Sequence, residues 1–139
     1  MAASAQSWNR VRYLGGTVKV KSSPHDWNTR ITVDRDRIEV EIAAATIFQS
    51  KAVVRLKPAQ VKSLSYGLRA WQSVAAVDGA KLHTKPPALF GLLADYTFVG
   101  IVYAGDDGKS GAILLQSRFG SQIVLALKAA TRKDIEDPP

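Results

Sequence analysis

Thr29–Asp34 (TRITVD) and Arg37–Ala43 (RIEVEIA) are the stretches that decide the fold, because both alternate apolar and polar residues without a break. In each stretch the isoleucines and valines fall on one face, and the residues opposite them are Arg30, Thr32, Glu39 and Glu41. Successive side chains of a β-strand point to opposite faces of a sheet, so the pattern predicts two half-buried strands. The short polar step Asp34-Arg35-Asp36 predicts a tight connection between them.

Five further segments are expected to be strands. In Val11–Lys21, an aromatic residue and a Gly-Gly bend precede the predicted first strand, which carries Val18 and Val20. The later strands are expected at Ala52–Lys57, Val61–Gly67 (with a possible extension through Trp71), Tyr96–Ala104 and Gly111–Arg118. The Asp-Gly step within residues 106–111 predicts a hairpin that joins the last two.

The last periodic segment, Gly120–Arg132, changes to helical spacing. Ile123, Leu127 and Ala130 recur at intervals of three and four residues, as they would on one face of a helix. We therefore expect a mainly β fold with one C-terminal α-helix, which closes an open end of the sheet. The predicted core comprises Ile31, Val33, Ile38, Val40, Phe98, Ile113 and Leu115.

Composition is that of one ordinary globular domain of 139 residues. The chain has no cysteine, which excludes disulfides, thiolate nucleophiles and zinc sites built on cysteine. The N-terminus lacks a secretory pattern, and we expect a cytoplasmic protein. Residues 86–104 are apolar, but a central Asp95 and a Pro-Pro start favour a turn into a buried strand over a membrane span.

Net charge is +7, and the excess lies in the middle of the chain. Residues 44–94 hold seven Lys or Arg and only one acidic residue, Asp78. Such an asymmetry can give a surface that meets phosphate or an acidic partner, although exposed strand faces and loops also explain it.

Residues suited to catalysis or metal binding are few. His25 and His83 are the only histidines, and neither has a second histidine or a cysteine at ligand spacing. Glu39 and Glu41 share the polar face of one strand, as in ordinary cross-strand pairing with basic residues. No nucleotide-binding glycine motif or nucleophile elbow occurs, so we expect no enzyme, no cofactor and no metal.

Three features of the chain resemble the pleckstrin-homology-like family, in the broad sense that includes bacterial and GRAM-type members. They are the opening Tyr13-Leu14-Gly15-Gly16, the strand–turn–strand segment Arg55–Leu64, and the ending of hairpin and helix. The resemblance covers residues 11–133, with residues 1–10 as a flexible arm and 134–139 as a tail. It implies a seven-stranded barrel or orthogonal sandwich capped by the helix, and a binding role.

The basic motif of phosphoinositide-binding members is incomplete here. Lys19 or Lys21 could begin it and Arg30 could end it, but Asn28 occupies a position that the motif requires to be basic. The helix also lacks the tryptophan usual in these domains. The resemblance therefore implies at most weak, unselective anion binding at a rim formed by Lys19, Lys21, Trp27 and Arg30.

Two classes of function remain open. The first is a non-catalytic module that binds a protein or peptide, along a sheet edge or in a groove beside the helix. The second is an electrostatic binder of anionic lipid or nucleic acid, which would use the basic surface that includes Arg55, Lys57 and Lys62.

Overall fold

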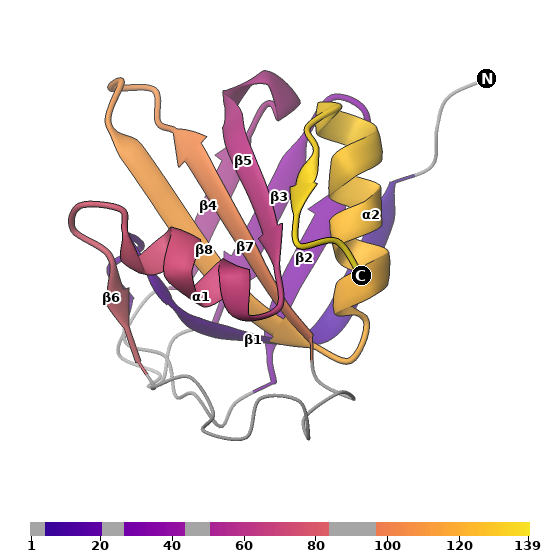
Figure 1. Ribbon diagram of the computed structural model, residues 1–139, viewed down its shortest axis with the longest axis horizontal. Helices are drawn as coiled ribbons and strands as arrows, with labels where there is room; N and C mark the ends of the chain where they lie inside the picture. Colours follow the sequence, from indigo (N-terminus) through magenta and orange to yellow (C-terminus); the bar gives the residue numbers. More distant parts are fainter. Residues whose placement is uncertain (1–4, 21–26, 44–50, 84–96) are drawn as a thin grey trace.

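Nine strands form one sheet in the computed structural model, which describes residues 5–20, 27–43, 51–83 and 97–139 (Figure 1). The strands are β1 (Gln6–Gly16), β2 (Thr29–Val33), β3 (Ile38–Ile42), β4 (Ala52–Leu56), β5 (Val61–Tyr66), β6 (Lys81–Leu82), β7 (Thr97–Ala104), β8 (Ser110–Ser117) and β9 (Ile135–Glu136). The helices are α1 (Leu68–Ala75) and α2 (Gly120–Thr131), with one 3-10 turn, η1 (Pro58–Gln60).

The order of strands is β4-β3-β2-β1-β8-β7-β5-β9, and β6 pairs with β1. Within the described residues the sheet is not closed, because its pairing ends at β4 on one side and at β9 on the other. We expected a seven-stranded barrel or orthogonal sandwich with one helix. The short strands β6 and β9 and the helix α1 are the elements that this expectation lacked.

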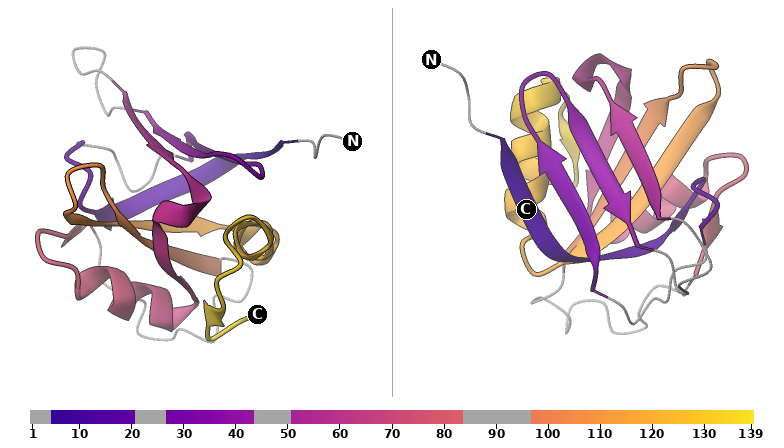
Figure 2. Two further views of the ribbon diagram at one scale, coloured as in Figure 1. Left: turned by 90° about the horizontal axis from the view of Figure 1, so that it is seen from above. Right: turned by 180° about the vertical axis from the view of Figure 1, so that it is seen from behind.

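The long strand β1 belongs to two layers of the sheet. Its first half pairs with β2, where Trp8 lies opposite Ile31, and its second half pairs with β8, where Tyr13 lies opposite Leu115. A bulge separates the halves, and Arg10 adopts a left-handed φ of 57° there. Figure 2 (left) shows the result: β2, β3 and β4 lie over β8, β7 and β5.

The inner core fills the space between these layers and α2. All seven predicted core residues are buried, and all but Phe98 belong to the cluster that also contains Val11, Tyr13 and Leu127. Ile123 and Leu127 are fully buried, so the predicted apolar face of the helix is confirmed. The alternating burial predicted for β2 and β3 is also confirmed.

A second core lies on the outer face of β7 and β8, under α1. It consists of Leu14, Ala70, Trp71, Val74, Phe98, Ala112 and Leu114. The rings of Trp71 and Phe98 meet edge to face with centroids 5.2 Å apart. Our alternative of a strand continuing through Trp71 is wrong: β5 ends at Tyr66, and α1 follows.

The first strand also lies elsewhere than predicted. It ends at Gly16, so Val18 and Val20 lie outside regular structure, whereas residues 6–10 belong to the sheet and not to an arm. The bulge explains the error, because it places Trp8 and Val11 on the same face three residues apart and breaks the period of two. Gly15 and Gly16 have φ of 136° and 146°, and a Cβ on either would collide with backbone of β6 or β8.

The predicted hairpin and the predicted strand within the apolar window are confirmed in the middle of the sheet. β7 and β8 form an antiparallel hairpin from Thr97↔Ser117 to Ala104↔Ser110, with Gly108 at a φ of 80° in its turn. Of the apolar window 86–104, residues 97–104 are this strand, and residues 86–96 lie outside the described part of the chain. Neither described helix has the length and apolar character needed to cross a membrane.

Candidate functional site

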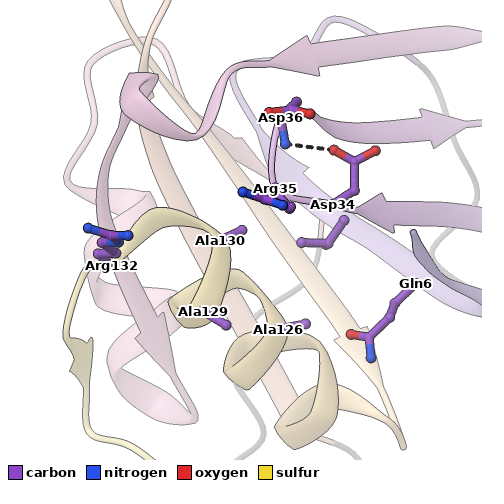
Figure 3. A pocket seen from close by; sticks show the side chains of 9 residues that line it. Gln6, Asp34, Arg35, Asp36, Ala126, Ala129, Ala130 and Arg132 are labelled. Carbon is purple, nitrogen blue, oxygen red and sulfur yellow. Dashed lines mark hydrogen bonds between the residues drawn. The ribbon is translucent and has the colours of Figure 1, made fainter. Parts of the chain in front are cut away.

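A groove of about 600 Å³ runs between α2 and the turn that joins β2 to β3 (Figure 3). We call it the α2 groove. Its lining combines apolar residues (Val33, Ala126, Ala129 and Ala130) with polar ones (Gln6, Asp34, Arg35, Asp36 and Arg132). Figure 3 shows the three alanines on the helix side, with Arg132 at the helix end and the turn residues opposite.

The turn side of the α2 groove is held rigidly by one carboxylate. Oδ1 of Asp34 accepts hydrogen bonds from the backbone N–H of Asp36 at 2.8 Å and of Arg37 at 2.7 Å. The backbone N–H of Asp34 in turn donates to the carbonyl oxygen of Arg37 at 2.9 Å. This side-chain bond to the following backbone is the usual means by which aspartate stabilises a turn. The Arg35 side chain therefore projects from a fixed backbone.

The helix side of the α2 groove is made of small side chains. Ala126, Ala129 and Ala130 recur at spacings of three and four, so they share one face of α2. Leu125, next to Ala126 in the helix, is 53% exposed. The helix ends at Arg132, whose φ of 60° turns the chain away. This face of α2 can accept an apolar segment.

The described residues of the predicted basic rim, Lys19, Trp27 and Arg30, lie on different segments of the chain. Lys19 is exposed and follows the end of β1, near the point where the backbone N–H of Thr17 donates to Ala112 of β8. Arg30 lies on the outer face of β2, where it faces Glu41 on β3 and donates to Oγ of Ser7 at 3.4 Å. Lys21 lies outside the described residues.

Trp27 has a partner on the protein itself. The Arg12 guanidinium lies 4.5 Å from the centroid of the Trp27 ring, within cation–π range. Arg12 also donates to Oε1 of Gln116 at 3.1 Å. The indole is half-buried in this arrangement, so Trp27 is held against the sheet beside β1 and β8.

The predicted basic surface is partly neutralised. Arg55 forms an ion pair with Glu39 at 3.2 Å, and Lys62 donates to Oγ of Ser110 at 2.8 Å. Lys51 forms an ion pair with Glu41 at 2.8 Å, and this hydrogen bond together with the charge of Lys51 lowers the pKa of the Glu41 carboxyl. The cross-strand pairing predicted for the two glutamates is therefore present.

The Lys57 side chain is exposed, and it is the backbone of Lys57 that forms hydrogen bonds within the structure. Its N–H donates to Oε1 of Gln60 at 2.8 Å, while Nε2 of Gln60 donates to the carbonyl oxygen of Ala104 at 3.0 Å. These bonds tie η1 to the β7–β8 hairpin. The ion pairs within the described residues are those of Lys51, Arg55 and Arg69, and Lys57 takes part in none of them.

The histidines offer little for chemistry. His83 packs edge-on against Tyr13 with ring centroids 5.4 Å apart, and burial lowers the pKa of its imidazole. Burial also raises the pKa of the Tyr13 phenol, whose hydroxyl donates to the carbonyl oxygen of Val18. His25 lies outside the described residues. Among the residues described, no three His, Asp or Glu side chains are grouped as a metal site requires.

Sequence reasoning anticipated a groove beside the helix but not the residues that line it. The alanine spacing of α2 was a readable signal for one wall. The opposite wall depends on which turn the helix packs against, and no pattern within β2 or β3 reveals this. No protein-family model matches the chain, and no curated protein matches its sequence.

Proposed function

We propose that this chain is a non-catalytic binding module with a pleckstrin-homology-like fold, and that it takes up a protein or peptide partner in the α2 groove. The order of elements supports the fold: consecutive antiparallel strands in two layers, a first strand shared between the layers, and a C-terminal helix against the inner core. In the described residues the pairing ends at β4 and at β9, which is compatible with a partly opened barrel of this kind.

The observation that carries the proposed function is the character of the α2 groove. Its volume of about 600 Å³ falls in the range of small-ligand and peptide sites, about 300–1,000 Å³. Its apolar floor of alanines is bordered by charged side chains, which is the usual arrangement of an interaction surface. Small side chains let the backbone of a partner approach closely, so we expect an amphipathic segment with its apolar face on α2.

The test is a selection from a displayed peptide library, with the wild-type protein as target and an Ala129→Arg variant as counter-target. Ala129 is exposed, so the arginine fills the groove without disturbing the core. We expect selected peptides to bind the wild type with micromolar affinity and to bind Ala129→Arg at least tenfold more weakly. Chemical shifts in the NMR spectrum should change along α2 and at the β2–β3 turn.

The matched control is Gln72→Arg, which adds the same charge to an exposed position of the other helix. Peptides that bind the α2 groove should bind this variant as they bind the wild type. If no peptide distinguishes Ala129→Arg from Gln72→Arg, the groove is not the binding site.

The alternative proposal is an electrostatic binder of anionic lipid or nucleic acid. The net charge of +7 and the exposed Lys19 and Lys57 favour it, whereas the ion pairs of Lys51 and Arg55 weaken the basic surface. Binding to anionic vesicles or to heparin should then fall by roughly tenfold or more between 50 and 200 mM salt. Retention on these ligands only at very low salt would contradict it.

A further inference from the structure

The last strand, β9, closes one edge of the sheet with only two residues. Ile135 and Glu136 pair in parallel with Leu64 and Ser65 of β5. Figure 1 shows β9 between β5 and α2, close to the C-terminus of the chain. The other edge of β5 pairs with β7 along its whole length, so β9 alone covers this side of the strand in the described structure.

Two side chains anchor β9. Ile135 is 8% exposed and belongs to the inner core. Oε1 of Glu136 lies 3.1 Å from Nη2 of Arg69, and Oγ of Ser73 donates to its Oε2 at 3.4 Å. Arg69 and Ser73 are one helical turn apart on α1, so both reach the same carboxylate. Three features therefore lie together: the edge of β5, the buried apolar site that holds Ile135, and two side chains that donate hydrogen bonds to one carboxylate.

These contacts hold the segment weakly. The side chains of the Arg69–Glu136 pair are both exposed, and exposed ion pairs contribute little to stability. Arg132 and Asp137 flank β9 with φ of 60° and 53°, and left-handed conformations of non-glycine residues are unfavourable. Short segments with few backbone hydrogen bonds to the rest of the sheet open at a small free energy compared with global unfolding.

We infer that this edge of β5, together with Arg69 and Ser73, is a second binding site, for an extended peptide in which an acidic residue follows an apolar one. In the structure the chain's own Ile135-Glu136 occupies the site and shows the chemistry that it accepts. A partner of that chemistry binds by displacing β9. The carboxylate-binding side chains of the site, Arg69 and Ser73, belong to α1, and none of the α2 groove's lining residues pairs with β9.

The test uses the full chain with both anchors removed, Ile135→Ser/Glu136→Ser. The probe is a fluorescent peptide of residues 132–139 (RKDIEDPP), and binding is followed by anisotropy. We expect the double variant to bind the peptide and the wild type to bind it at least tenfold more weakly, because the tethered segment competes at an effective concentration of about millimolar. Adding Arg69→Glu to the double variant should weaken binding at least fivefold.

A charge exchange supplies the control for specificity. The peptide with arginine in place of its glutamate (RKDIRDPP) should bind poorly to the double variant and should regain affinity when Arg69→Glu is added. A folded double variant that does not bind RKDIEDPP, or binds both peptides alike, would overturn the proposal.

Hydrogen exchange of the wild-type protein tests the same proposal if the double variant does not fold. The amides of β9 should exchange at a much lower free energy of opening than those of β7 and β8. Equal protection in all three strands would show that β9 is an integral strand that no partner displaces.

Discussion

Gly120 shows how a single residue can fix the position of a helix. A Cβ there would collide with the side chain of Thr97, whose Oγ1 donates to the carbonyl oxygen of Ser117 at 2.7 Å. Glycine at the start of α2 therefore lets the helix approach β7 closely. In an unobstructed helix the change from glycine to alanine would stabilise by up to about 1 kcal/mol.

We expect the opposite sign for Gly120→Ala. The substitution should lower the free energy of unfolding by about 1–3 kcal/mol, as over-packing does in other cores. Urea denaturation followed by circular dichroism measures the change, and Gln122→Ala, at an exposed position of the same helix, should stay within about 0.5 kcal/mol. A stabilised Gly120→Ala variant would mean that α2 does not pack against Thr97 in this way.

His83 provides a pH-dependent probe at the same scale. Burial lowers the pKa of its imidazole below the ordinary 6.5, so the folded state binds the proton less readily than the unfolded state. The contribution of neutral His83 to the free energy of unfolding is therefore complete above about pH 6.5, and it is lost as the pH falls through the pKa of His83 in the folded protein. NMR titration should show a lower midpoint for His83 in the folded protein than in urea.

The variant His83→Gln isolates this effect. Its stability should change less between pH 7 and pH 5 than that of the wild type, because the residue that titrates is gone. Equal pH dependence of the two proteins would show that the protonation of His83 is not coupled to folding.

At the scale of elements, the β2–β3 turn depends on the Asp34 carboxylate. Replacing it by alanine leaves the N–H groups of Asp36 and Arg37 without their partner, at a cost of about 1 kcal/mol. Asp34→Asn should cost less, because the amide oxygen can still accept one of these bonds. Chemical denaturation measures both, and Asp36→Ala should be near neutral because Asp36 is exposed.

The turn variant also bears on the α2 groove. Since Asp34 fixes the backbone that carries Arg35, Asp34→Ala should weaken peptides selected for the groove even where the protein remains folded. Unchanged peptide affinity would indicate that the turn wall takes no part in binding.

At the scale of the whole molecule, the sheet supports one core on each face, and consecutive residues of β8 report on them. Leu115 points into the inner core and Leu114 into the outer core under α1, and both are fully buried. Leu115→Ala and Leu114→Ala should each lower the free energy of unfolding by about 2–5 kcal/mol. Leu125→Ala, at a site 53% exposed, should change it by less than about 0.5 kcal/mol.

In a Trp8→Phe/Trp27→Phe variant, tryptophan fluorescence comes from Trp71 in the outer core, and it should give the same midpoint of unfolding as far-UV circular dichroism, which reports on the strands that enclose the inner core. A small effect of Leu114→Ala, or an earlier midpoint for fluorescence, would show that α1 is a separately unfolding layer.

Sequence alone determined the parts of the fold that local periodicity encodes. The strict alternation of β2 and β3, the Asp-Gly hairpin of β7 and β8, and the apolar face of α2 are all readable because each pattern lies within one or two neighbouring elements. The buried status of the seven core residues followed from these patterns. For the candidate site, the sequence predicted only that a groove could lie beside the helix.

Tertiary structure alone decided the elements and the site that depend on distant partners. The bulge at Arg10 hides β1 from the sequence because it breaks the alternation of a strand that pairs with both β2 and β8. β9 exists only because β5 offers it an edge, and its two residues carry no periodicity. The α2 groove forms where the helix meets the Asp34 turn, a contact between segments that no local pattern relates.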